Sequence, residues 1–131
     1  MSFEFTKDNY QVFYYRNSCT LKVPVLDYLK SVSAKEQAKI AIYIGFLKGQ
    51  KGYLDEPYSR YLGNGLRELR VDFGRNRNRI VYITVEAQKI ILLHAFFKKT
   101  SKTPEQEIVR ALNNLQDYKI HEDIIAYEKT N

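Results

Sequence analysis

The chain has 131 residues, of which 44% are apolar, and this favours one domain that buries its core without disulfides or metals. One cysteine and two histidines are too few for a disulfide framework or a zinc site, and no apolar run is long enough to span a bilayer. Twenty-one Lys and Arg against fifteen Asp and Glu give a formal charge of +6, which favours polyanionic partners. Since no secretory signal precedes Tyr10, we expect a cytoplasmic protein without a membrane segment or a cofactor.

The first predicted elements are a strand and a short helix. Residues 10–15 are aromatic and β-branched, which is typical of a strand. Pro24 precedes the apolar stretch 25–29, and proline is common at the first position of a helix. We therefore expect a short helix that begins near Pro24.

A longer helix follows. Ser33 and Glu36 have the spacing of a capping box, and apolar residues then recur every three or four positions until Gly49. This pattern predicts a helix that packs into the core and ends at the glycine. Residues 53–65 contain a proline and two glycines, which predicts a loop with a short strand at 59–62.

Three further strands are expected in succession. Residues 66–73 alternate between apolar and polar, which predicts a half-buried strand. A turn over 74–78, rich in Gly, Asn and Arg, leads to a β-branched strand at 79–85. Residues 86–88 predict a second hairpin turn, and 89–97 are apolar on both faces, as a central strand would be.

The chain is expected to end in a helix. Thr103 is predicted to cap it, with Pro104 at its first position and Gln106 three residues after the cap. Apolar residues between 108 and 115 form its buried stripe, and 121–127 predict another helical turn or two.

The order of the elements predicts an α+β fold, an antiparallel sheet of about four strands with helices packed on it. No repeat, low-complexity stretch or linker divides the chain, so residues 1–131 are expected to form a single domain. Its core would span about 10–117, with 118–131 as a C-terminal extension.

Positive charge is concentrated in the middle of the chain. The residues concerned are Arg67, Arg70, Arg75, Arg77, Arg79, Lys98, Lys99 and Lys102. RNA is cleaved without a metal when a 2′-hydroxyl attacks the adjacent phosphate, a reaction that needs proton transfer and neutralisation of phosphate charge. Basic side chains supply both functions, so a basic groove at the strand edges is a candidate cleavage site.

Three segments together resemble a known family. They are Leu66–Arg70 (L-R-E-L-R), Arg79–Tyr82 (R-I-V-Y) and Leu92–Pro104 (L-L-H-A-F-F-K-K-T-S-K-T-P). The third motif is long and ordered, and is the most specific of the three. These segments resemble the phage-derived, HigB-like branch of the RelE/ParE toxin superfamily, and the resemblance covers about residues 60–117.

The resemblance implies a RelE-like α+β domain that acts as the toxin of a type II toxin–antitoxin system. Such a toxin enters the ribosomal A site and cleaves translated mRNA without a metal, and a helix-turn-helix antitoxin neutralises it by direct binding. ParE-like members of the superfamily poison DNA gyrase instead, so the fold alone does not decide the activity. A nucleic-acid-binding phage protein without catalysis is a third interpretation, because the sequence shows no obvious general base.

Two arginines are candidate catalytic residues. Arg79 matches the arginine that RelE-type toxins use on the phosphate, and the alternative is a surface salt bridge. Arg70 matches the last residue of the L-x-E-L-R pattern, and its alternative is a structural pair with Glu68 or Asp72. Glu68 itself is expected to orient one of these arginines rather than to act as a base.

The end of the central strand supplies further candidates. Lys98 and Lys99 match the lysine pair of the family and are expected to bind phosphate, although a regular strand would point them to opposite faces. Lys102 follows and is expected to steer RNA. His94 matches a family position as a candidate catalytic residue, but a lone histidine on an apolar strand face favours a structural role.

The remaining candidates are RNA contacts. Arg67 is a candidate contact, but a solvated side chain is the interpretation that we favour for it. Arg75 and Arg77 lie in a turn longer than is common in RelE-type chains, which predicts an additional loop that faces RNA or the ribosome. Tyr61 and Tyr82 are candidates for stacking on bases, since aromatic residues among basic ones suit single-stranded RNA. With eleven tyrosines in the chain, chance placement is the alternative for both.

Overall fold

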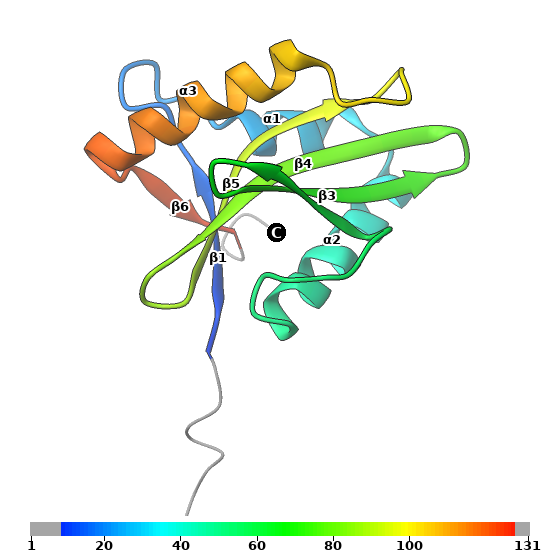
Figure 1. The fold of residues 1–131 in the computed structure, drawn as a ribbon, viewed down its shortest axis with the longest axis horizontal. Helices are drawn as coiled ribbons and strands as arrows, with labels where there is room; N and C mark the ends of the chain where they lie inside the picture. Colours follow the sequence, from blue (N-terminus) through cyan, green and yellow to red (C-terminus); the bar gives the residue numbers. More distant parts are fainter. Residues whose placement is uncertain (1–8, 128–131) are drawn as a thin grey trace, which may run out of the picture.

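A six-stranded sheet with helices on both faces organises residues 9–127, the part of the chain that this computed structural model describes (Figure 1). The strands are β1 (Gln11–Tyr15), β2 (Ser59–Gly63), β3 (Leu66–Phe73), β4 (Asn76–Val85), β5 (Lys89–Phe97) and β6 (Ile124–Ala126), and the helices are α1 (Pro24–Ser31), α2 (Ala34–Gly49) and α3 (Glu105–His121). Their order across the sheet is β2-β3-β4-β5-β1-β6.

The predicted α+β class is confirmed, but the expectation of about four antiparallel strands is wrong. The sheet has six strands and is mixed, because β1 pairs with β5 in parallel while the other neighbours are antiparallel. Residues 124–126, where we expected helical turns, form β6 and pair with β1, Phe13 opposite Ala126. This short segment becomes a strand because the free edge of β1 offers partners for its backbone hydrogen bonds. The sequence of residues 124–126 alone does not reveal these partners.

The helices α1 and α2 confirm the local sequence signals at their N-termini. The Ser33 hydroxyl accepts a bond from the Glu36 backbone N–H at 3.2 Å, and the Glu36 carboxylate accepts one from the Ser33 N–H at 3.3 Å. This reciprocal pair is the predicted capping box of α2. Pro24 begins α1, as expected from its fixed φ.

The hairpin between β3 and β4 is tighter than predicted. Phe73 pairs with Asn76, so only Gly74 and Arg75 form the turn, and the expected long loop over 74–78 does not exist. Gly74 has a φ of 60°, a conformation that suits the first central position of a two-residue hairpin turn. Because of this turn, β4 begins at Asn76 and carries Arg77 within the strand.

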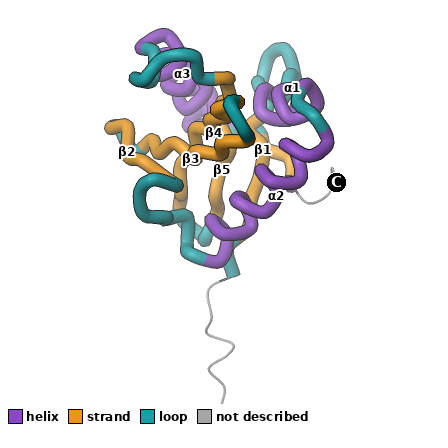
Figure 2. Tube along the Cα trace, turned by 90° about the vertical axis from the view of Figure 1, so that its right-hand side faces the viewer, coloured by secondary structure: helices purple, strands orange, loops and turns teal. Residues whose placement is uncertain are grey.

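Helices lie on both sides of the sheet (Figure 2), and each face of the sheet has its own apolar core. On one face, α1 and α2 cover residues that include Leu69, Ile80 and Leu92. On the other, α3 covers Val81 and Leu93. Side chains alternate between the faces along each strand, so this division shows on which side every polar residue of β3 and β4 lies.

Asp117 of α3 connects the helix to the end of β1 and to the segment that follows it. Its carboxylate accepts hydrogen bonds from the Tyr15 hydroxyl at 2.7 Å, the Ser18 hydroxyl at 2.7 Å and the Ser18 N–H at 3.0 Å. The bond from the Ser18 side chain, followed by that from Tyr15, lowers the pKa of Asp117 from 3.8 to about 2. The ionised carboxylate therefore stabilises the folded chain.

We expect Asp117→Asn to lower the free energy of unfolding at neutral pH by about 2 kcal/mol, the equivalent of this pKa shift. Because the folded pKa is depressed, the contribution is complete above the unfolded pKa and disappears as the pH falls through about 2. Urea unfolding between about pH 7 and pH 2 would show the two proteins converging at low pH. The exposed Glu86→Gln is the matched control, and equal stability of Asp117→Asn and wild type at neutral pH would contradict the assignment.

Candidate active site

Four basic side chains converge on the sheet face that carries α3. The register places Arg79 of β4 directly opposite Arg70 of β3, and Arg60 of β2 opposite Glu68 of β3. Residues 68 and 70 lie two apart on one strand, so both pairs lie on the same face. Lys98 follows β5, and its charge interacts with all four of these groups. We call Arg60, Arg70, Arg79 and Lys98, with Glu68 among them, the basic cluster.

Arg79 is the most enclosed arginine of the cluster, with 2% of its side chain exposed. Its Nη1 donates to Asp72 Oδ1 at 2.7 Å and to the Asn78 carbonyl at 2.9 Å. The Nε groups of Arg79 and Arg70 are buried and have no hydrogen-bond partner within the described chain. Two like charges face each other here, which is unfavourable, and Asp72 offsets part of that charge through its ion pair with Arg79. The pair is therefore suited to bind a phosphate, which accepts such donors and neutralises their charge.

Glu68 is completely buried beside these cations. Its Oε2 accepts a hydrogen bond from the Thr103 hydroxyl at 2.7 Å, while Oε1 has no partner within the described chain. The prediction that Thr103 caps α3 is therefore wrong. Pro104 occupies the N-cap without a side-chain cap, and the Thr103 hydroxyl donates to Glu68 of β3 instead. Through this bond, Glu68 holds the segment between β5 and α3 against the cluster.

Lys98 is the other enclosed cation, with 3% of its surface exposed. Its burial lowers the pKa of the ammonium group, and Arg79, Arg70 and Arg60 lower it further, while Glu68 opposes the shift. A lysine with a lowered pKa is deprotonated more readily than an exposed one, so it can take up a proton from a substrate. Lys99 is exposed, and the two lysines do not share one environment.

His94 lies on the same face but under α3 rather than in the cluster. Its Nε2 is 2.7 Å from Glu107 Oε1 of α3, and its ring stacks on Phe96 at a centroid distance of 5.8 Å. The side chain is 12% exposed. These contacts support the structural role that we favoured for it, since they connect β5 to the first turns of α3.

Two predicted RNA contacts lie on the opposite face, within the α2 side of the molecule. Tyr82 is fully buried, and its hydroxyl donates to the Gly52 carbonyl at 2.9 Å, so its ring is not open for stacking on a base. The Nε of Arg67 donates to Ser59 Oγ at 3.0 Å, and its guanidinium lies 4.7 Å from the centre of the Tyr53 ring. Both residues therefore support the loop before β2, which corrects our expectation for Tyr82.

The other predicted contacts lie around the cluster. Arg75 and Arg77 are exposed at the tip of the β3–β4 hairpin, and Arg77 pairs with Asp72 on the face of the cluster. Lys102 is exposed in the segment before α3. Tyr61 is 58% exposed, with its hydroxyl bound by the Gly65 N–H at 3.2 Å. These side chains are available to solvent.

Arg60 is the one member of the cluster that sequence analysis missed. It lies in the short strand expected at 59–62, and a hairpin from this strand to the next places it opposite Glu68. The register shift between Tyr61 and Gly63 prevents a simple count of the pairing. The only signal in the sequence that Arg60 belongs to this site was therefore the acidic residue Glu68 in the next predicted strand.

The described residues limit two other kinds of site. No group of three or more His, Cys, Asp and Glu side chains among residues 9–127 is arranged to hold a metal ion. Within the same range, no helix is both long enough and apolar enough to cross a membrane.

Comparison with protein-family models identifies a family. A family model described as "Phage derived protein Gp49-like (DUF891)" matches residues 27–116, more than half of the chain. This range contains α2, the strands β2 to β5 and every member of the basic cluster, but neither β1 nor β6. A search of the curated proteins found no match.

Proposed function

The chain belongs to the phage-derived Gp49-like family, and from this premise we propose that it is the toxin of a type II toxin–antitoxin pair. Its activity is the metal-independent cleavage of mRNA on the ribosome, in the manner of RelE and HigB toxins, and a helix-turn-helix antitoxin neutralises it. This function requires a cytoplasmic protein. The observation that carries the proposal is the basic cluster, in which buried arginine donors without partners in the described chain lie beside a lysine of lowered pKa.

The arginines bind the scissile phosphate in this proposal. Arg79 and Arg70 face each other across β3 and β4, so a phosphate between them accepts bonds from both guanidinium groups. In the transition state the phosphorus carries five oxygens and additional negative charge, which two fixed cations stabilise more strongly than water does. Arg60 adds positive potential from the neighbouring strand.

Lys98 transfers the proton. In its neutral form the amine takes the proton of the 2′-hydroxyl, whose oxygen attacks phosphorus as the bond from phosphorus to the 5′ oxygen breaks. The products are a 2′,3′-cyclic phosphate and a 5′-hydroxyl, whose oxygen takes a proton from solvent. Glu68 balances part of the charge of the cluster.

The substitution Lys98→Arg separates the two contributions of this side chain, its positive charge and its ability to take up a proton. An arginine keeps the positive charge but is not deprotonated at accessible pH, so we expect mRNA binding to persist and cleavage to fall by about a hundredfold or more. Wild-type cleavage should rise with pH as Lys98 loses its proton, and the variant should lack this rise. Single-turnover cleavage on programmed ribosomes at several pH values measures both effects. Lys99→Arg is the matched control, and equal pH profiles for wild type and Lys98→Arg would exclude the lysine as the base.

The function itself is tested by induced expression followed by primer extension on host transcripts. We expect new 5′ ends inside translated frames with the wild type, and none with a double Arg79→Ala, Lys98→Ala variant. Growth arrest without new ends would overturn the proposal and favour a gyrase poison. If a folded wild-type protein causes no arrest when it is expressed alone, a binding role without catalysis would replace the toxin.

A further inference from the structure

The outer side of α2 is unusual for a helix at a protein surface. Its inner side packs into the core through Ile40, Ile44 and Leu47. Its exposed positions are also mainly apolar or small: Ala34, Ala38, Ala41, Ile42, Gly45, Phe46 and Gly49. Ile42 is 57% exposed and Phe46 is 51% exposed. The outer side of a surface helix is normally polar, so this side of α2 has the composition of an interface.

A groove runs along each flank of this helix. The first, of about 430 Å³, lies between α1 and α2 and is lined by residues that include Leu26, Leu29, Ala38, Ala41 and Tyr127. The second, of about 620 Å³, lies between the end of α2 and the following loop and is lined by residues that include Phe46, Tyr53, Leu54 and Tyr58. Small side chains on the ridge between them let a second helix approach closely, while its larger side chains enter the grooves. We call the exposed residues of α2 and these two grooves the α2 surface.

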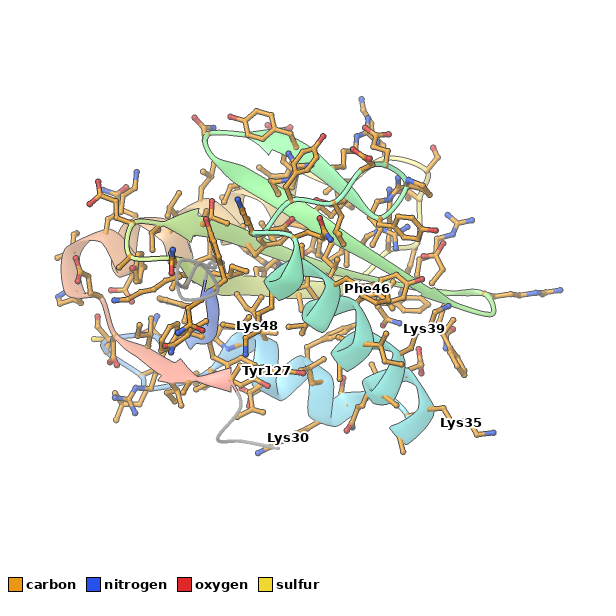
Figure 3. All side chains as sticks on the ribbon, turned by 90° about the horizontal axis from the view of Figure 1, so that it is seen from below. Lys30, Lys35, Lys39, Phe46, Lys48 and Tyr127 are labelled. Carbon is orange, nitrogen blue, oxygen red and sulfur yellow. The ribbon has the colours of Figure 1, made fainter. Side chains whose placement is uncertain are left out.

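Lysines surround the α2 surface. Figure 3 shows Lys30 on α1, and Lys35, Lys39 and Lys48 along α2, around Phe46. The one carboxylate of α2, Glu36, is buried in the capping box and faces the core. Asp55 lines the second groove, and the Lys39 ammonium donates to the Asp72 carbonyl, so the exposed Lys30 and Lys35 supply most of the open charge. The rim is therefore more positive than negative around an apolar centre, and a complementary partner carries acidic residues around an apolar stripe.

We propose that the α2 surface binds an acidic, amphipathic helix of a protein partner. The inference rests on the proposed function, in which that partner is the antitoxin. A second copy of the chain fits poorly, since a two-fold contact would bring the lysine rims of both copies together. RNA also fits poorly, because protein–nucleic acid interfaces are more polar than this one, with its exposed Ile42 and Phe46.

The α2 surface and the basic cluster lie on opposite sides of the sheet. The α2 core contains Leu69 and Ile80, whereas Glu68, Arg70 and Arg79 alternate with them and point to the other face. A helix bound to α2 therefore leaves the cluster uncovered. Neutralisation then occurs because the bound partner prevents entry into the ribosomal A site, and not because it fills the cleavage site.

The probe for this proposal is the product of the open reading frame that adjoins the gene, purified and titrated against the full chain. Ile42→Asp and Phe46→Asp each place a charge in the apolar centre, so we expect the Kd to rise by about a hundredfold. Val109→Asp is the matched control, since Val109 is a 47% exposed apolar residue on α3. A double Lys30→Glu, Lys35→Glu variant should raise the Kd by about tenfold, mainly through slower association, and Lys119→Glu should not.

RNA cleavage by the α2 variants shows whether a substitution has abolished only the binding of the probe or has also unfolded the chain. Ile42→Asp is outside the cluster, so we expect it to cleave RNA like the wild type and to escape neutralisation. A double Arg79→Ala, Lys98→Ala variant should bind the probe with unchanged Kd. If all the α2 variants are neutralised as the wild type is, the inference is wrong while the proposed function stands. If the probe does not bind the wild type, the antitoxin assignment fails, both in the proposed function and in this inference. If the chain forms dimers and Ile42→Asp dissociates them, the α2 surface binds a second copy and the inference is also wrong.

Discussion

Replacing Arg79 by alanine is expected to lower the rate of mRNA cleavage by about a thousandfold, a larger effect on activity than that of any other single substitution in the basic cluster. Arg79 is held rigidly, since Nη1 bonds both Asp72 Oδ1 and a backbone carbonyl at 2.7 and 2.9 Å. A positioned guanidinium that neutralises phosphate charge in the transition state contributes effects of this order. The measurement is single-turnover cleavage on programmed ribosomes.

Arg77→Ala is the matched control for this experiment. Arg77 is exposed on the same strand and the same face, so its loss should weaken RNA binding mildly and in a salt-dependent way. Arg79→Lys keeps the charge without the two-pronged geometry, and we expect it to recover only part of the rate. Arg79→Ala should remain folded because Asp72 is 60% exposed and stays hydrated without its partner. Cleavage by Arg79→Ala within about tenfold of the wild type would remove Arg79 from the mechanism.

Replacing Glu36 by alanine is expected to lower the free energy of unfolding by roughly 3 kcal/mol. One Glu36 oxygen accepts bonds from the side-chain amides of Asn76 and Asn78, both at 3.1 Å, and the other closes the capping box with Ser33. Asn78 is fully buried and also accepts a bond from the Tyr28 hydroxyl. Without Glu36, the Asn78 amide would be buried without this partner, and α2 would lose the carboxylate half of its capping box and its connection to β4.

Chemical denaturation of Glu36→Ala beside the exposed control Lys35→Ala tests this prediction. The control should change the free energy of unfolding by less than about 0.5 kcal/mol. The hydrogen bond from Asn78 is the main cause of the lowered pKa of Glu36, and it outweighs the effect of burial. A lowered folded pKa means that this stabilisation is present above the unfolded pKa and is lost as the pH falls through the folded one. A loss below about 1 kcal/mol at neutral pH would show that other groups hold α2 in place.

Sequence signals predicted the elements whose causes are local. The capping box of α2, the alternation in β3 and the apolar run of β5 each depend on residues close together in the chain. The number and direction of the strands were not predictable in this way. β6 is three residues long, and its partner β1 lies at the other end of the chain. The parallel pairing of β1 with β5 likewise depends on contacts between distant segments.

The alternation of side chains along the predicted strands was enough to predict part of the candidate site. Arg70 and Arg79 were predicted on two successive strands, with basic groups at the strand edges, and the register places them opposite each other. Three features depended on contacts that the sequence does not show. Thr103 bonds Glu68 across the fold, Tyr82 is buried below the loop before β2, and Lys98 is enclosed while Lys99 is exposed.

The position of β1 also determines when the molecule can fold during synthesis. β1 is made first, yet it lies between β5 and β6, with Gln11 beside Lys89 and Tyr15 beside Ile124. The nascent chain therefore cannot complete its sheet until the C-terminal strand has left the exit tunnel, and long-range pairing of this kind forms slowly. Under the proposed function, the toxin is therefore incomplete while β6 is still inside the ribosome. The delay gives a partner that is already present time to meet the chain as it folds.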